Sequence, residues 1–325
     1  MDTVNWGIVG CGDVCERKSG PPMYKTPHSA LVAVMRRDAE KAADFARRHG
    51  VRKSYADAEK LIADPGVDIV YIATPPDSHK ELAIRALEAG KPVYVEKPMA
   101  MNHAQCLEMI AAVEKAGRKL FVAYYRRALP YFRKVKELLD AGAIGRPLTV
   151  AVSYLRPESP ADRNAANLPW RLRREVGGEG YFCDMAPHTL DILDFLVGEI
   201  TDAKGYKANR GGIYDVADTV TATFRFASGA AGTGTWCFVA PPGAAEDAVV
   251  ITGREGSVRF STFEFSPIEL RTAQGTQRFR IDPPEHIQGP LIETIVAELR
   301  GEGRCPSTGI SAARTSRVMD RIMNE

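Results

Sequence analysis

The sequence predicts an α/β protein of two domains, in which a parallel-sheet domain precedes an α+β domain with a large open, mainly antiparallel sheet. Three observations predict this fold class. The chain has 325 residues, more than a single domain usually contains. In the first half, apolar runs without polar alternation are separated by helical segments of about 10–15 residues, which is typical of a parallel sheet covered on both faces. In the second half, apolar and polar residues alternate along strand-like runs.

The elements of the first half are bounded by turn and cap signals. Five apolar runs predict strands at Val4–Val9, Ala30–Met35, Asp68–Ala73, Pro92–Glu96 and Lys119–Tyr124. Helix caps are predicted at Asp38, at Ser78 with Glu81 (capping-box spacing) and at Asn102 with Gln105. Parallel sheets bind ligands at the carboxyl ends of their strands, so the residues that follow each strand are the functional candidates.

The second half of the sequence predicts a sheet with one buried face and one solvent-exposed face. Asp218–Phe226 alternates Thr219, Thr221 and Thr223 with apolar residues. Similar runs predict strands at Leu148–Leu155, Ala231–Val239, Ala248–Thr252, Ser257–Phe260, Glu269–Ala273 and Thr276–Ile281. Helices near Asp184–Val197, Gly289–Arg300 and Ile310–Met323 are predicted to cover one face of this sheet. We place the domains at 1–125 and 126–325, and expect the uncovered face to join a homodimer or homotetramer.

Composition excludes several classes of partner. The net charge is +2 and no Lys/Arg block stands out, so no nucleic-acid partner is predicted. No apolar stretch approaches the roughly 20 residues of a membrane span, and no export signal is present at the start, so we expect a cytoplasmic protein. The six cysteines are interpreted as free thiols. Cys11 and Cys15 lack a second pair of ligands, so no metal site is predicted.

A glycine turn follows the first strand directly. Gly10-x-Gly12 stands where a backbone must approach a pyrophosphate at a helix N-terminus. The fingerprint is imperfect because Cys15 occupies the usual third glycine or alanine position. The strand before it and the βαβ pattern after it nevertheless indicate a Rossmann dinucleotide-binding domain, with contacts from Gly10, Gly12, Asp13 and Val14. Gly20-Pro21-Pro22 interrupts the following helix, which is therefore expected to have an unusual start or length.

The residues at the end of the second predicted strand indicate which nicotinamide cofactor is bound. NAD-binding sites usually carry an acidic residue there, whereas this chain has Arg36 followed by Arg37. Arginine pairs well with a 2′-phosphate, so NADP(H) is favoured over NAD(H). One alternative is that Arg36 and Arg37 are solvated surface residues. Another is that the strand ends later, so that Asp38 reaches a ribose. Further cofactor contacts are predicted after the third and fourth strands, at Thr74, Pro75, Pro76, His79, Glu96 and Lys97.

Two clusters carry the predicted chemistry. Lys97, in Glu96-Lys97-Pro98, follows the fourth strand, where a lysine would lie near the nicotinamide, and the bond before Pro98 is a candidate cis peptide. Asp184 and His188 are spaced i, i+4 on one helix face, so the carboxylate can orient the imidazole as a general base. The plain alternatives are a turn with a surface lysine, and a helix cap followed by a packed histidine. Asp191 is a competing partner for His188.

These motifs together resemble those of the glucose–fructose oxidoreductase/inositol dehydrogenase (Gfo/Idh/MocA) family over nearly the whole chain. The resemblance rests on Gly7–Gly12, Ala73-Thr74-Pro75 with His79, Glu96-Lys97-Pro98, Tyr125-Arg126-Arg127 and Asp184-x-x-x-His188-x-x-Asp191. It implies that Lys97, Asp184 and His188 are catalytic and that the substrate is a sugar or polyol. Trp170-Arg171 is similar to the Trp-Arg element of 1,5-anhydro-D-fructose reductases, which use NADPH. Dihydrodiol dehydrogenases of the family have tyrosine where His188 stands.

The resulting hypothesis is an oxidoreductase that transfers a hydride between the nicotinamide and a carbinol or carbonyl of a sugar-like compound. His188 would exchange the hydroxyl proton and Lys97 would stabilise negative charge on the same oxygen. Candidates for the substrate wall are Tyr125, Arg127, Trp170 and Arg171. One alternative is a non-catalytic dinucleotide-sensing regulator, which we would expect to have lost Lys97 or His188. The other is a glycosidase or epimerase that recycles bound NAD, against which Arg36 argues.

Overall fold

The computed structural model describes residues 2–324, and the chain forms two compact units. Unit 1 comprises Met1–Leu129 with Pro284–Ala313, and unit 2 comprises Pro130–Pro283 with Arg314–Glu325. The predicted division after residue 125 lies close to the boundary at Leu129, but the prediction did not include the return of Pro284–Ala313 to unit 1. The predicted fold class, a Rossmann-type parallel sheet followed by a mainly antiparallel one, is confirmed.

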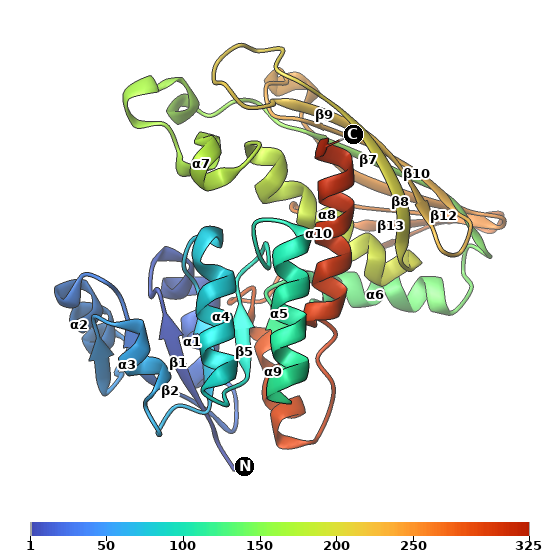
Figure 1. Cartoon of the computed structure of the whole chain (residues 1–325). Coiled ribbons are helices and arrows are strands. Elements are labelled where there is room, and N and C mark those ends of the chain that lie inside the picture. The colour runs from blue at the N-terminus through green and yellow to red at the C-terminus, as the bar shows by residue number, and fades with distance from the viewer. Residues whose placement is uncertain (1, 325) are drawn as a thin grey trace. The chain divides into compact units, whose positions relative to one another are not determined.

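Unit 1 is built on a six-stranded parallel sheet in the order β3-β2-β1-β4-β5-β6 (Figure 1). Its strands are β1 Val4–Val9, β2 Ser29–Met35, β3 Lys53–Tyr55, β4 Ile69–Ile72, β5 Val93–Val95 and β6 Leu120–Val122. The five predicted runs all contain strands. β3 was not predicted, because this short edge strand is largely exposed and has no apolar run. The strand order reverses between β1 and β4, which places a ligand crevice at their carboxyl ends.

Helices cover both faces of this sheet. The helical elements of unit 1 are η1 Cys15–Ser19, α1 Gly20–Lys25, α2 Ala39–Arg48, α3 Ala58–Ile62, η2 Pro76–Ser78, α4 His79–Glu88, α5 His103–Ala116, η3 Tyr125–Ala128 and α9 Gly289–Arg300. Alternate strand residues enter two separate cores: Val70 and Ile72 pack with α4 and α5, whereas Tyr71 packs in the core that receives α9. The prediction that Gly289–Arg300 covers the second sheet was wrong. Helical periodicity identifies an apolar stripe but not the sheet against which it packs.

Unit 2 is built on an eight-stranded sheet in the order β14-β13-β12-β11-β7-β10-β9-β8. β7 and β10 pair in parallel, and the other neighbours are antiparallel. The strands are β7 Pro147–Leu155, β8 Ile200–Ala208, β9 Thr219–Phe226, β10 Ala231–Cys237, β11 Glu246–Gly253, β12 Gly256–Phe260, β13 Ile268–Thr272 and β14 Gly275–Phe279. β8 was not predicted, since its sequence is mostly polar and a bulge breaks its alternation.

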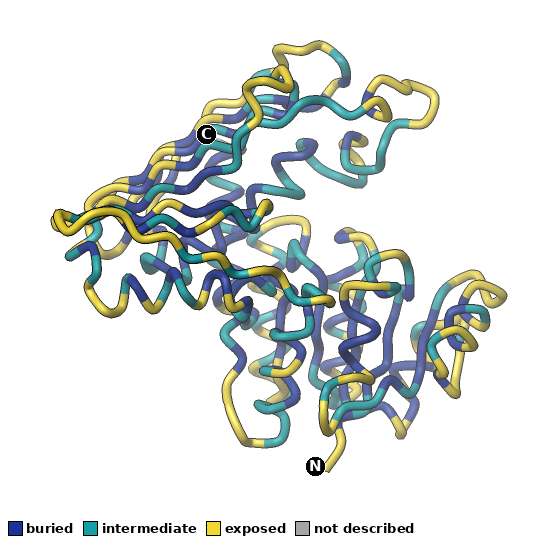
Figure 2. Tube along the Cα trace, turned by 180° about the vertical axis from the view of Figure 1, so that it is seen from behind, coloured by how far each residue is buried: buried dark blue, intermediate teal, exposed yellow. Residues whose placement is uncertain are grey.

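One face of this sheet is buried and the other is exposed. Along β9, Val220, Ala222 and Phe224 are buried while Thr221 and Thr223 are exposed, and Figure 2 shows the same alternation on neighbouring strands. The helices of unit 2 are α6 Pro130–Asp140, η4 Pro160–Arg163, η5 Ala165–Asn167, η6 Trp170–Leu172, α7 Arg174–Gly177, α8 Tyr181–Val197, η7 Pro242–Ala244 and α10 Gly309–Asn324, whose first five residues belong to unit 1. α10 packs very close to β8: a Cβ at Gly205 would lie 2.3 Å from the carbonyl oxygen of Ile322.

Two of the three predicted helix caps are confirmed. The Asp38 carboxylate accepts from the Lys41 amide at the start of α2, and the Asn102 side chain accepts from the Gln105 amide at the start of α5. The capping box at Ser78 was wrong. The Ser78 hydroxyl donates to Thr74 Oγ1 (2.8 Å) and the Pro75 carbonyl (2.9 Å), because the chain makes a 3₁₀ turn before α4 begins.

Candidate active site

The glycine turn at the end of β1 packs against the residues that follow β4. Gly10 has φ +90°, and a Cβ there would lie 2.8 Å from Thr74 Cγ2, so the position requires glycine. The amides of Gly10 and Cys11 both donate to the Met35 carbonyl (2.9 and 3.1 Å), which ties the turn to β2. At Gly12 the space is open: the nearest atom to an added Cβ is the Gly10 carbonyl oxygen, at 3.8 Å. A ligand can therefore approach the backbone at Gly12, and helical conformation begins at Asp13 and Val14.

The helix after the turn has the predicted irregular start. Cys15–Ser19 forms a π-helical turn, and α1 then begins with Pro21 and Pro22 in its first turn, where proline is tolerated. Cys11 and Cys15 are fully buried. Burial raises the pKa of the Cys11 thiol to about 11 and that of Cys15 well above its ordinary value. Both thiols are therefore protonated at neutral pH and fill the turn as small apolar groups.

A cavity of about 680 Å³ lies at the carboxyl ends of β1, β2 and β4. Six of the predicted cofactor residues line it: Gly10, Gly12, Arg36, Arg37, Thr74 and Pro75. Lys41 adds a third cation. The Asp38 carboxylate also lies there, but it caps α2 and forms an ion pair with Lys41 at 3.1 Å. Hydrogen bonds from Lys41 hold the pKa of Asp38 below its usual value.

His79 occupies a different position from these lining residues. Its ring is fully buried, with Nδ1 2.9 Å from the Pro98 carbonyl oxygen and Nε2 2.8 Å from the Thr74 carbonyl oxygen. Burial lowers the pKa of the imidazole. The ring therefore connects the turn after β4 to the turn after β5. That second turn contains a cis peptide bond between Lys97 and Pro98, as predicted, while Pro76 is buried in the 3₁₀ turn.

Glu96 is the centre of a buried hydrogen-bond network beneath Lys97. Its Oε1 accepts from Tyr71 Oη and Gln288 Nε2, both at 2.7 Å, and its Oε2 accepts from the Lys97 amide at 3.2 Å. Gln288 Oε1 in turn accepts from Tyr94 Oη at 2.7 Å. The sequence did not identify Tyr71, Tyr94 or Gln288 as site residues. The first two read as ordinary strand residues, and Gln288 comes from the far end of the chain.

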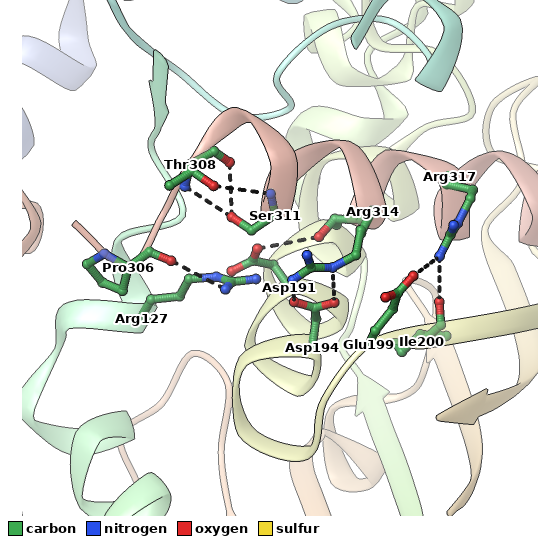
Figure 3. Close-up of polar contacts among 11 residues, drawn as sticks. Arg127, Asp191, Asp194, Glu199, Ile200, Pro306, Thr308, Ser311, Arg314 and Arg317 are labelled. Atoms are coloured by element: carbon green, nitrogen blue, oxygen red, sulfur yellow. Dashed lines mark hydrogen bonds and ion pairs between the residues drawn. The ribbon is translucent and has the colours of Figure 1, made fainter. Parts of the chain in front are cut away.

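The predicted wall residues of unit 1 lie in the 3₁₀ turn η3. Arg126 and Arg127 are both buried. The guanidinium of Arg126 lies 5.1 Å from the centroid of the Tyr125 ring, a cation–π contact. Arg127 Nη1 donates to the Pro306 carbonyl at 3.4 Å (Figure 3). Arg127 is thus fixed against the segment that returns from the end of the chain.

In unit 2, α8 carries the predicted acid–base pair. Asp184 lies in the first turn of the helix and His188 one turn later, with 6% of His188 exposed. Arg171 Nε donates to Asp184 Oδ2 at 2.5 Å, and its guanidinium lies 4.5 Å from the centroid of the Trp170 ring. Of the two residues predicted as substrate wall, Arg171 therefore reaches α8 through Asp184, and Trp170 contacts the Arg171 guanidinium.

An aromatic side chain that the sequence did not identify lies beside His188. Phe263 meets the imidazole edge to face, with centroids 6.1 Å apart. It stands in the loop between β12 and β13, which Asp247 holds: the carboxylate accepts from the amides of Thr262, Phe263 and Glu264 at 2.8, 2.6 and 3.0 Å. Local sequence carries no signal for this pairing, because the loop and α8 are far apart in the chain.

The second half of α8 is anchored to α10. Asp194 forms a bidentate ion pair with Arg314 (2.8 and 2.7 Å), and Asp191 accepts from the Thr315 hydroxyl at 3.4 Å (Figure 3). Arg317 donates to Glu199 and to the Ile200 carbonyl. Asp191, the competing partner for His188, thus belongs to the carboxylates that hold these two helices together.

Comparison with known proteins identifies relatives along the whole chain. The model of an "Oxidoreductase family, NAD-binding Rossmann fold" matches residues 4–124, and that of the "GFO/IDH/MocA C-terminal domain" matches residues 132–259. "Oxidoreductase P35" of Formosa agariphila is 39% identical over 98% of this chain and 97% of its own length. The 1,5-anhydro-D-fructose reductase of Ensifer adhaerens is 29% identical over 94% of this chain and 90% of its own.

The solved structures include a levoglucosan dehydrogenase in complex with NADH and levoglucosan. It superposes with a TM-score of 0.87 at 27% identity, covering 99% of this chain and 96% of that one. Among residues 2–324, no helix combines the length and apolarity needed to cross a membrane.

Proposed function

Because the chain belongs to the Gfo/Idh/MocA family of oxidoreductases with an NAD-binding Rossmann fold, we propose that it oxidises a carbinol of a sugar, polyol or related cyclic compound, or reduces the matching carbonyl, with NADP(H) as its preferred cofactor. The observation that carries the proposal is the Lys97 turn, which follows β5 over the buried carboxylate of Glu96. Sugar-derived substrates in the names of the relatives, anhydrofructose and levoglucosan, support the substrate class.

The residues present fit a dinucleotide. The open backbone at Gly12 suits the close approach of a pyrophosphate, and the cavity beside it continues to the end of β2. Arg36, Arg37 and Lys41 line this cavity, while Asp38 is engaged by the α2 amide and by Lys41. Three cations and a committed carboxylate favour a 2′-phosphate over a ribose diol. The levoglucosan dehydrogenase structure contains NADH, so NAD(H) is the competing choice.

We assign catalytic roles to Lys97, His188 and Asp184. The bound nicotinamide supplies or accepts the hydride. Lys97 donates a hydrogen bond to the substrate oxygen and stabilises negative charge as it develops there. His188 takes the hydroxyl proton in oxidation and returns it in reduction, and Asp184 with Arg171 sets the electrostatic surroundings of the imidazole.

The structure supports some of the proposed substrate contacts of the wall residues more strongly than others. Trp170 presents an aromatic face of the kind that stacks on sugar rings, and Arg171 is held beside it. Tyr125 offers a phenol, whereas Arg127 is buried and would contact substrate with only part of its guanidinium. Single Trp170→Leu and Arg127→Met variants should separate these contributions through the substrate KM.

The test is a panel of sugars, anhydrosugars and polyols, followed by nicotinamide absorbance with NADPH and with NADH. We expect turnover with at least one member and a kcat/KM at least about tenfold higher with the phosphorylated cofactor, as one charge-assisted contact would produce. Cofactor binding without turnover across the panel would instead favour the non-catalytic regulator. Equal kcat/KM with the two cofactors would overturn the NADP preference alone.

The exposed face of the second sheet is our proposed oligomer interface. Thr221 and Thr223 of β9 and Thr233 of β10 present small side chains there. An exposed sheet face with small side chains suits a second copy of the same sheet. We expect a homodimer or homotetramer by light scattering, and a shift to monomer when Thr223→Arg and Thr233→Arg are combined.

A further inference from the structure

The hydrogen-bond network beneath Lys97 joins two distant parts of unit 1. Gln288 is 1% exposed and stands just before α9, in the segment that returns from the end of the chain. Its backbone amide donates to the carbonyl of Lys18 at 3.3 Å, within the π-helical turn Cys15–Ser19 that follows Gly12. Its side chain reaches Glu96, at the end of β5. One residue thus connects the α9 segment, the turn region and the residue that precedes Lys97.

The amide of Gln288 fixes the direction of every bond in this network. An amide oxygen only accepts and an amide nitrogen only donates, so Tyr94 donates to Gln288, and Gln288 donates to Glu96. Burial and the nearby Glu96 carboxylate raise the pKa of the Tyr71 and Tyr94 phenols well above the usual range, so both remain donors. Tyr71, Gln288 and the Lys97 amide therefore all require Glu96 to accept.

The position of Glu96 in the sheet relates this network to the nicotinamide half of a bound dinucleotide. The end of β2, with Arg36, lies on one side of the strand-order reversal, where the adenosine half of a dinucleotide binds. β4 and β5 lie on the other side, which leaves the nicotinamide half at their ends. A buried carboxylate there attracts the positive charge that the nicotinamide carries only in its oxidised form.

We propose that Gln288 is a positioning residue: it holds Glu96 as a buried acceptor, which aligns the backbone of Lys97 and places a negative charge at the nicotinamide end of the cofactor site. The catalytic part of this proposal rests on the function proposed for Lys97. The electrostatic part depends only on cofactor binding, so the two can be tested separately.

Two variants and a matched pair of controls test the proposal. Gln288→Leu keeps the bulk of the side chain but removes both of its hydrogen bonds. Gln288→Glu keeps the bond from Tyr94 and sets two carboxylates face to face, where they share one proton. Gln277→Leu and Gln277→Glu make the same changes at an exposed position of β14. The readouts are the dissociation constants of NADP⁺ and NADPH, by calorimetry and cofactor fluorescence, and the steady-state kinetics.

The ratio of the two dissociation constants is the readout that a merely structural role would not move. When the facing carboxylates in Gln288→Glu lose their shared proton, the site gains a negative charge, and we expect the ratio to shift about tenfold towards NADP⁺ as the pH is raised through that step. The cofactor's phosphates are common to both forms and cancel in the ratio. Of the neighbouring titratable groups, burial lowers the pKa of His79 and raises those of Tyr71, Tyr94, Cys15 and Cys305, which moves them away from neutral pH. Lys97 and Tyr125 are present in both the wild type and Gln288→Glu, so comparing the two proteins at each pH removes their contribution.

The kinetic readout tests the alignment of Lys97. We expect Gln288→Leu to lower kcat about tenfold or more while the substrate KM changes less than about threefold, because a displaced lysine affects the reaction more than substrate binding. A pH-independent ratio in Gln288→Glu, or kcat values matching the Gln277 controls, would overturn the Gln288 proposal. The two parts can also fail separately. If Gln288→Glu shows the expected ratio of dissociation constants but the wild type turns over no substrate, the proposed reaction is wrong and the charge assigned to Glu96 is supported.

Discussion

The cofactor cavity of unit 1 and the α8 site of unit 2 are built by different means. The cavity is shaped by backbone: the Gly10 turn, the open approach at Gly12 and the end of β2. The α8 site is shaped by side chains from distant segments, with Arg171 on Asp184 and Phe263 beside His188. A site made of local backbone leaves a motif in the sequence, whereas a tertiary contact such as that of Phe263 with His188 does not. Substrate preference can therefore vary over a constant cofactor site.

The largest effects are expected when one proposed catalytic group is removed from each unit, Lys97 from unit 1 and His188 from unit 2. We expect Lys97→Met and His188→Asn each to lower kcat by about 10²–10⁴-fold, since each removes a positioned donor or base. Cofactor dissociation constants should be unchanged in His188→Asn, because His188 does not line the cavity that holds Gly10, Gly12 and Arg36. Lys60→Met, at an exposed position of α3, serves as the control. Turnover near the wild-type level in either variant would refute the assigned role.

Removing a side chain from the cavity should change cofactor choice without changing the reaction. We expect Arg36→Ala to weaken NADPH binding by about 10–100-fold, the loss of one charge-assisted contact to a phosphate, and to leave NADH binding almost unaltered. Arg52→Ala, another exposed arginine of unit 1, is the matched control. A parallel loss of both cofactors would show that Arg36 does not read the 2′-phosphate.

The two glycines of the turn should fail in different ways. Gly10→Ala introduces strain at φ +90° and a contact with Thr74, so we expect a loss of about 1–3 kcal/mol in the free energy of unfolding as well as weaker cofactor binding. Gly12→Ala meets no atom closer than 3.8 Å, so the melting temperature should hold while cofactor affinity falls about tenfold. Thermal denaturation together with NADPH titration separates these outcomes. Tight cofactor binding by Gly12→Ala would contradict the assigned approach.

The smallest expected effect concerns the loop that holds Phe263. Asp247→Ala removes the acceptor of three backbone amides, so Phe263 should lose its fixed place beside His188. We expect the substrate KM to rise about 3–10-fold, in keeping with the cost of one or two such bonds, with cofactor dissociation constants unchanged. Asp215→Ala, at an exposed loop position, is the control. A changed cofactor affinity would show that the two sites are not built independently.

Most of the fold could be predicted from the sequence, because strands and helices follow local patterns. The five buried strands of unit 1 and seven strands of unit 2 were located by apolar runs and alternation. β3 and β8 were missed because exposed or bulged edge strands lack those patterns. The prediction of the sheet that α9 covers was wrong, because the apolar stripe of this helix would fit either sheet.

The candidate site divides along the same line. The Gly10 turn, Arg36 and the Lys97 turn could be found because each sits directly after a strand, and the structure places the first two in one cavity. Gln288 and Phe263 could not be found, because each acts on a partner far away in the chain. Asp247 could not be found because no local pattern marks a carboxylate that accepts from amides 15–17 residues further on. Only the Gln-Gly-Pro signature of a helix start marks Gln288 in the sequence.

The return of Pro284–Ala313 to unit 1 sets the order in which the molecule can mature. During synthesis the strands that carry Trp6, Tyr94 and Phe121 emerge early, yet one face of their sheet waits for Leu291, Ile292 and Ile295 of α9. That apolar face stays uncovered while every strand of unit 2 leaves the ribosome, so the part encoded first is completed among the last. A chain that stops before Pro284 lacks both this cover and Gln288. Premature termination thus yields a protein with the complete glycine motif but an open core.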